Sequence, residues 1–292
     1  MGSPAIAIAT CEWHPELEAE TRLLLEALQA RGIAAAAVPW SAPGPGGWDS
    51  YDAVVVRQTW DYTWRLDEFL AWTASIGERL HNGPEVIAWN CDKRYLFDLA
   101  GAGIPAIAGE RLPPGAPLRP PSSGRFVVKP AVSGGARHTA VYDESGHDAA
   151  AALVARLHAD GRDVLVQPYY ASVDDEAETA VIFIEGRLSH CMRKGPLLAV
   201  GEPPSEEAYG AEDMRRRQGA DDVIALAHRT WAFAAERFGA PLYARVDVLR
   251  GDDGEPAVLE LELIEPALFL DFAPGSAEAL AAALHRRAGG DA

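Results

Sequence analysis

The sequence contains very little lysine. Of its 26 lysine and arginine residues, only three are lysine, at Lys93, Lys129 and Lys194. A chain that uses arginine almost everywhere is expected to keep lysine where a compact ammonium group is required. The alternative is an arginine-biased genome in which three lysines remain by chance. The surroundings of Lys93 and Lys129, described below, favour function for these two.

Positive charge, long apolar runs and cysteine are also scarce. The net charge of −17 argues against wrapping nucleic acid or docking on an anionic membrane, although a nucleotide needs only a local basic pocket. No apolar run approaches the ~20 residues of a membrane span, and no basic segment followed by an apolar stretch marks a signal peptide. The three cysteines, Cys11, Cys91 and Cys191, are odd in number and far apart, which suits free thiols and no zinc site. We therefore expect a cytoplasmic protein that binds neither nucleic acid nor membranes.

The N-terminal region predicts a small parallel sheet. An apolar stripe over residues 16–30 predicts a helix between two short apolar strands. A strand–helix–strand opening of this kind favours an α/β layer with helices on both faces. Residues 113–121 are rich in proline and are the expected connector into a further lobe. The strands are expected at residues 5–9, 33–38, 51–56 and 86–90.

The segment after the third strand is a candidate substrate site, because ligands of open α/β sheets bind beyond the carboxyl ends of strands. It offers the guanidinium of Arg57 and the carboxylate of Asp61. In the alternative interpretation, its aromatic residues only plug the edge of the sheet. These aromatic residues are Trp60, Tyr62 and Trp64.

Residues 125–139 combine a strand, a lysine and a glycine-rich turn. Phe126-Val-Val128 predicts the strand, Lys129 stands at its end, and Ser133-Gly-Gly135 follows. Such a turn can direct several backbone N–H groups at phosphate oxygens, with the lysine beside them as a point charge. The alternative is an ordinary hairpin with a loose loop.

A second hairpin predicts a metal site. Arg245 and Asp247 share one face of a strand by period-2 alternation, and Glu260 and Glu262 share one face of the next strand. Paired antiparallel, these strands bring three carboxylates together, which is the ligand set that Mg²⁺ prefers. The alternative is an exposed acidic hairpin face.

The order of these motifs resembles the ATP-grasp superfamily, and within it the glutathione synthetase-like ligases. The resemblance implies an α/β (α+β) fold with an N-terminal substrate-binding domain over residues 1–90 and an ATP-grasp domain over residues 91–292. It also implies a lid lobe at about residues 122–172. The motifs, in order, are Lys93 at a helix start, Lys129 with its glycine-rich turn, Gln167-Pro-Tyr169 after a strand, Asp247, and Glu260-Leu-Glu-Leu-Ile-Glu-Pro266.

The resemblance further implies roles for single residues. Lys93 and Lys129 would contact the nucleotide, and Arg193 would contact the transferred phosphate. Glu178 would bind the ribose, with Asp174 as the second choice, while Glu262 stands where the family has an asparagine. The glycine-rich loop would cover the phosphates through Ser133, Gly134 and Gly135. The adenine would be held by Gln167, Pro168 and Tyr169, Mg²⁺ (or Mn²⁺) by Asp247, Glu260 and Glu262, and an amino-acid-like substrate by Arg57, Trp60, Asp61, Tyr62 and Arg245.

Three segments look most similar to one subgroup of this family, which includes the cyclo-ligase for O-ureido-serine in cycloserine biosynthesis. They are Arg57 to Tyr62, Tyr243 to Asp247 and Glu260 to Pro266. Three functions follow as alternatives. They are an intramolecular cyclo-ligase, an intermolecular ADP-forming ligase that joins a carboxylate to an amine, and a nucleotide-binding regulatory protein without catalysis. The sequence does not distinguish the intramolecular from the intermolecular ligase, and it does not distinguish a monomer from a homo-oligomer.

Overall fold

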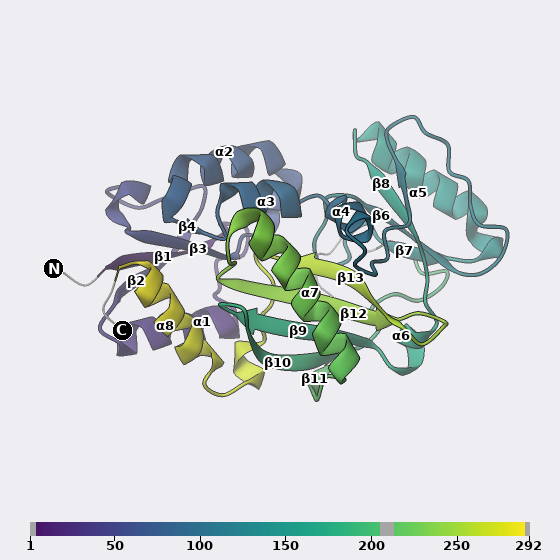
Figure 1. Cartoon of the computed structure of the whole chain (residues 1–292). Coiled ribbons are helices and arrows are strands. Elements are labelled where there is room, and N and C mark those ends of the chain that lie inside the picture. The colour runs from purple at the N-terminus through teal and green to yellow at the C-terminus, as the bar shows by residue number, and fades with distance from the viewer. Residues whose placement is uncertain (1–3, 205–212, 290–292) are drawn as a thin grey trace.

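The computed structural model describes residues 4–204 and 213–289, and its first sheet is parallel. Its strands stand in the order β2-β1-β3-β4, and two layers of helices cover its faces (Figure 1). Helix α1 (Ala19–Ala30) packs on one face, and helix α2 (Leu66–Ile76) packs on the other. This part agrees with the predicted βαβ opening. The strands are β1 (Ala5–Thr10), β2 (Ala34–Pro39), β3 (Ala53–Gln58) and β4 (Leu80–His81).

The predicted strand at residues 86–90 is wrong. This segment lies in helix α3 (Pro84–Asn90), and the fourth strand is instead the two-residue β4 just before it. Pro84 occupies the first turn of α3, where a missing N–H costs nothing. A short apolar run does not by itself distinguish a buried strand from a helix. Here Pro84, which suits the first turn of a helix, favours the helix.

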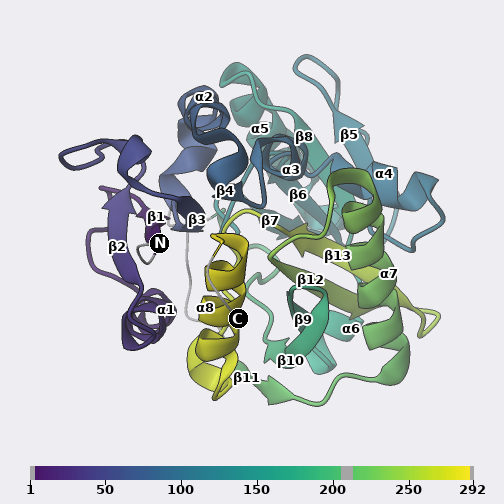
Figure 2. The same ribbon diagram turned by 60° about the vertical axis from the view of Figure 1, so that its left-hand side comes forward.

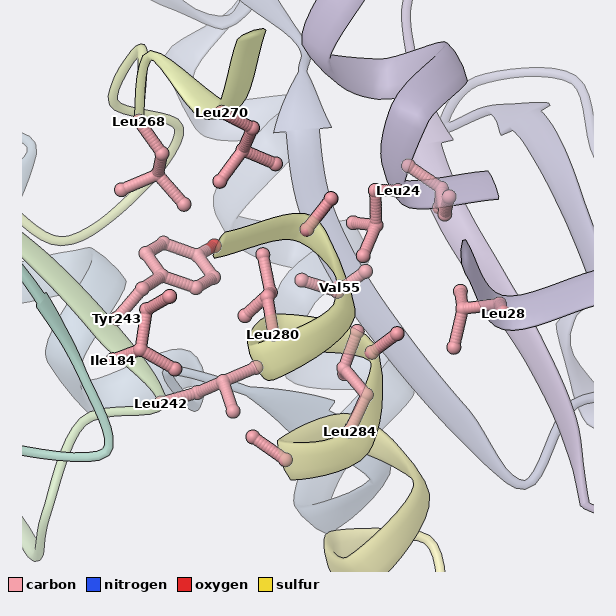
Figure 3. Packing of buried hydrophobic residues seen from close by; sticks show 14 of the residues in the cluster. Leu24, Leu28, Val55, Ile184, Leu242, Tyr243, Leu268, Leu270, Leu280 and Leu284 are labelled. Carbon is pink, nitrogen blue, oxygen red and sulfur yellow. The ribbon is translucent and has the colours of Figure 1, made fainter. Parts of the chain in front are cut away.

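The central sheet is antiparallel, with strand order β11-β10-β9-β12-β13. Helix α7 (Asp221–Phe238) covers one face of it. The other face packs against the C-terminal helix α8 (Ser276–Arg287), which lies between the first sheet and the central sheet (Figure 2). Leucines of α1 and α8 and the buried Tyr243 make up much of this shared core (Figure 3). The strands are β9 (Glu178–Ile184), β10 (Arg187–Lys194), β11 (Met214–Arg217), β12 (Tyr243–Arg250) and β13 (Pro256–Glu262).

A third sheet, with strand order β5-β8-β6-β7, forms a lobe beside the central sheet (Figure 1). Helix α5 (His147–Ala159) packs on it with its own apolar core. The lobe includes a strand, β5, that precedes the expected start of the lid near residue 122. Its strands are β5 (Glu110–Leu112), β6 (Phe126–Pro130), β7 (Ala140–Tyr142) and β8 (Val164–Pro168). The remaining short helices are α4 (Tyr95–Gly101), α6 (Ser172–Asp175) and 3₁₀ turns at Trp48–Ser50, Trp60–Trp64, Gly77–Arg79, Glu144–Gly146 and Leu270–Phe272.

Two buried asparagines connect the first sheet to the central sheet. Asn82 donates to the carbonyls of Tyr243 (2.9 Å) and Leu263 (2.7 Å), and it accepts from the N–H of Leu242 (2.7 Å). Asn90 bonds the carbonyl of Leu261 and the N–H of Leu263, both at 2.8 Å. Because buried backbone groups must be paired, these amides fix the start of β12 and the end of β13, where the candidate site lies. No helix among the described residues is long and apolar enough to cross a membrane.

Candidate active site

A cavity of about 840 Å³ is lined by residues from all three sheets. One end is an apolar slot, the middle is crowded with charged side chains, and the other end is formed largely by the loops beyond the first sheet. The site residues predicted from the sequence that line it are Arg57, Trp60, Tyr62, Lys93, Lys129, Ser133, Gly134, Gly135, Gln167, Pro168, Tyr169, Glu178, Arg245, Glu260 and Glu262. The fold therefore gathers residues that are far apart in the sequence.

The apolar slot lies at the end of β8. The side chain of Gln167 is buried and donates to the carbonyl of Ile107, which fixes one wall. The ring of Tyr169 lies under the Arg125 guanidinium, 4.2 Å from ring centroid to Arg125 Cζ. Slots of this kind accept a flat ring, and the other apolar residues that line it are Ile107, Val173, Leu249 and Leu259.

Two lysines meet at the glycine-rich loop. Lys93 Nζ donates to the carbonyl of Ser133 (2.7 Å) and lies 3.0 Å from a carboxylate oxygen of Glu260. Burial lowers the pKa of Lys129 to about 8, although the nearby Glu260 opposes this change. In the loop, Gly135 and Ala136 have φ of 58° and 60°, in the left-handed region that favours glycine. The loop and the two ammonium groups together present N–H donors to one part of the cavity, as a polyphosphate requires.

The three carboxylates predicted to converge do so. Ligand oxygens of Asp247, Glu260 and Glu262 lie within 4.8 Å of one another, because β12 pairs with β13 so that Asp247 faces Glu260. Burial opposes ionisation of Glu260, but Lys93 and Lys129 outweigh it and lower its pKa to about 2.

Burial raises the pKa of Glu262 to about 7, with Glu260 and Asp247 adding to the rise and Arg245 opposing it. Crowded carboxylates of this kind repel one another and fit a divalent cation. The donor set is thus compatible with Mg²⁺.

The structure excludes Arg193 from this cluster and puts Lys194 there. Residues directly opposite one another in adjacent strands share a face. Arg193 faces Thr179, which faces Val248 in the core beneath α7, whereas Lys194 faces Glu178.

The side-chain contacts agree with this register. Lys194 Nζ lies 2.8 Å from Asp247 and 2.9 Å from Glu178, while Arg193 pairs with Asp213 at 2.7 Å and does not line the cavity. The two-residue period of a strand could have predicted this difference, because Lys194 shares a face of β10 with Met192 and Arg193 lies on the opposite face. Asp247 itself lies just behind the cavity wall, and its side chain is 1% exposed. Lys194 and Arg245 cover it, with Arg245 Nε 3.0 Å from Asp247 Oδ1.

At the far end of the cavity, the expectation for Asp61 is also corrected. The 3₁₀ turn over Trp60–Trp64 directs its carboxylate inward, where it accepts from Trp40 Nε1 (2.7 Å) and Arg65 (3.1 Å), and it does not line the cavity. Its neighbours Trp60 and Tyr62 do line the cavity. The Asp61 carboxylate thus lies beside the apolar core that contains Trp40, on the α2 side of the first sheet.

Arg57 lines this far end and is only 3% exposed. Its Nη2 donates to Glu20 and to the carbonyl of Pro266 (2.7 Å), while Nε and Nη1 have no partner among the described residues. Glu20 in turn accepts from the N–H of Leu268 at 2.8 Å. Arg57 thus ties α1 to the loop after β13, and it keeps two donors for a ligand.

These features define the class of the protein. An apolar slot, lysines beside a glycine-rich loop and a carboxylate cluster, held between an antiparallel sheet and a smaller lobe, are the site of a nucleotide-dependent ligase of the ATP-grasp type.

Comparison with known proteins narrows the assignment. A family model described as D-cycloserine synthetase DcsG, N-terminal domain, matches residues 6–82. The cycloserine biosynthesis protein DcsG of Streptomyces lavendulae is 37% identical over 279 residues, which cover 90% of this chain and 92% of that protein. The chain therefore belongs to the family of DcsG within the ATP-grasp ligases, and it is an ATP-dependent ligase.

Solved structures agree with this fold. The crystal structure of D-cycloserine synthetase DcsG has a TM-score of 0.87 and 33% identity, covering 97% of this chain and 99% of that one. The ATP-grasp ligase PsnB, in complex with a minimal precursor, has a TM-score of 0.63 and 19% identity, covering 98% of this chain and 100% of PsnB. A Bacillus anthracis D-alanine–D-alanine ligase complexed with ATP also has a TM-score of 0.63, with 12% identity and coverage of 98% and 97%. The likeness to the last two concerns the fold.

Proposed function

We propose that this ligase closes an amino-acid derivative on itself, with O-ureido-serine as the favoured substrate, in the manner of a cycloserine-forming enzyme. The support from relatives is the 37% identity to DcsG over nearly the whole chain. The single observation that carries the proposal is the order of groups along one cavity. The slot at Gln167 is followed by the lysines and carboxylates and then by Arg57.

The proposed reaction follows from that order. Adenine occupies the slot, the polyphosphate lies under the glycine-rich loop, and the substrate carboxylate meets the γ-phosphate near Lys129, Lys194 and Arg245. These cations neutralise the charge that spreads over the transferring group. The substrate carboxylate becomes an acyl phosphate, which a nitrogen of the same molecule then attacks, with phosphate as the leaving group. The loop at Ser133–Gly135 excludes water, since an exposed acyl phosphate hydrolyses.

The carboxylate cluster is the proposed holder of Mg²⁺, with Mn²⁺ able to replace it. Asp247, Glu260 and Glu262 would supply the oxygen ligands, and a bound cation would neutralise phosphate charge. In the structure, Lys93, Lys194 and Arg245 pair with these carboxylates. The same cations would turn to phosphate oxygens when nucleotide and metal enter together.

The test is release of ADP and phosphate with Mg-ATP across amino acids, dipeptides and O-ureido-serine, with products identified by mass spectrometry. Release with O-ureido-serine alone, and a first cyclised product lighter than the substrate by one water, is the expected result. Release only with pairs of compounds would make the protein an intermolecular ligase and refute the proposal.

A further inference from the structure

Glu265 is a half-buried carboxyl group at the substrate end of the cavity, and no described residue is its partner. It lies three residues beyond the end of β13, lines the cavity and is half-buried. Among the described residues, no hydrogen bond and no ion pair within 4 Å involves its side chain. The other half-buried carboxylates that enclose this end are paired, Glu20 with Arg57 and Glu262 with Arg245, whereas Asp271 at the rim is exposed to solvent. Glu265 is therefore a carboxyl group without a counter-ion in the described part of the chain.

The two guanidinium groups at this end of the cavity already have partners. Arg57 is held by Glu20 and by the carbonyl of Pro266, and its two remaining donors are not bonded to Glu265. Arg245 bonds Glu262 and Asp247. Two guanidinium groups thus stand beside the three carboxyl groups of Glu20, Glu262 and Glu265, while Asp247 is also paired with Lys194.

An unpaired carboxylate in such a place is costly. Burial raises the pKa of Glu265 well above its usual range, and Glu262 adds to this rise while Arg57 opposes it. A ligand with a positive charge would remove the cost by restoring an ion pair inside the cavity. The nucleotide cannot do so, because it is itself an anion.

We propose that Glu265 binds the protonated α-amino group of the substrate and so selects amino acids over acids that lack the amine. This inference rests on the proposed function, since it assumes an amino-acid-like substrate in the same cavity. Glu262 and Glu265 lie near enough to repel each other electrostatically, so the ammonium would lie close to the reacting carboxylate, as the short spacing of an α-amino acid requires. Trp60 and Tyr62 line the same end of the cavity.

The test compares two substrates in three proteins. The substrates are O-ureido-serine and the same compound with hydrogen in place of the α-amino group. The proteins are the wild type, Glu265→Gln and the control Asp271→Asn, which removes a different, exposed carboxylate of the cavity rim. The wild type is expected to prefer the amine by about 10- to 100-fold in kcat/KM, as for a hydrogen bond to a charged group.

In Glu265→Gln this preference is expected to fall to about threefold, through a rise in KM for the amine alone. The Kd of Mg-ATP and the melting temperature should stay those of the wild type, and Asp271→Asn should keep the full preference. An unchanged preference in Glu265→Gln would overturn the inference, as would a loss of Mg-ATP affinity, which would make Glu265 part of the metal site.

Failure of the proposed function would be visible separately. If the wild type turns over neither compound, calorimetry with D-serine and L-serine in the presence of a non-hydrolysable ATP analogue still tests Glu265. Weaker binding of serine to Glu265→Gln than to the wild type would support the inference. Equal binding, or no binding to either protein, would overturn it.

Discussion

The adjacent cations at the end of β10 give opposite predictions. Lys194 is 11% exposed and lies between Glu178 and Asp247. Lys194→Ala removes a charged donor from the cavity, and loss of one donor to developing charge costs roughly 10²- to 10³-fold in kcat. We therefore expect kcat/KM to fall about 100-fold. Arg193 pairs with Asp213, which is 70% exposed, and such pairs contribute about 0–1 kcal/mol. Arg193→Ala should change kcat/KM by less than about fivefold.

The assay is the initial rate of ADP release at varied Mg-ATP, with calorimetry of Mg-ATP binding as a readout that needs no second substrate. Lys194→Arg keeps the charge and should recover part of the loss. Melting temperatures of all three variants show whether the fold is intact. Equal losses for Lys194→Ala and Arg193→Ala, or a larger loss for Arg193→Ala, would refute the assignment of faces on β10.

Three further predictions follow from the same geometry. Glu260→Gln should abolish turnover while the melting temperature is retained, because the carboxylate cluster loses a ligand; full activity in an ADP-release assay would exclude the metal assignment. Since the pKa of Lys129 is about 8, its side chain carries a positive charge below pH 8 and loses that charge above it. KM for Mg-ATP should therefore rise between pH 7 and 9.5, by up to about tenfold per pH unit above the pKa. Lys129→Arg should remove this pH dependence, and a flat wild-type profile would contradict the prediction. Asn82→Ala deletes three buried hydrogen bonds between β4 and the central sheet, so the free energy of unfolding in urea should fall by about 3 kcal/mol at ~1 kcal/mol per bond; a loss below about 1 kcal/mol would show that these bonds do not hold the sheets together.

Local patterns in the sequence predicted much of the site. Alternation along two strands was enough to bring Asp247, Glu260 and Glu262 together, because side-chain direction in a strand repeats every two residues whatever surrounds it. Lys129 followed by the glycine-rich turn predicted a donor-rich loop, because the ammonium and the backbone N–H groups of such a turn lie in one short segment. The βαβ opening followed from apolar periodicity. The domain boundaries and the roles of single residues remain predictions.

Other features depended on neighbours that are distant in the sequence. Arg193 and Lys194 are equally basic, and only the packing of α7 on one face of the central sheet decides which of them reaches the cavity. The Asp61 side chain points inward because Trp40 and Arg65 donate hydrogen bonds to its carboxylate there. No local pattern shows which acids acquire partners, so Glu265 looks like any other glutamate until its surroundings are known.

The sequence by itself therefore determined the class of the protein and most of the groups that can meet a nucleotide and a metal, since these lie in short segments with a fixed period. Tertiary structure alone decided which side chains share a cavity, which charges are paired and which carboxyl group is left without a partner among the described residues. The physical reason is that burial and charge compensation are properties of contacts between segments. Here those segments are as distant as α1, β3 and the loop after β13, which meet through Glu20, Arg57 and Pro266.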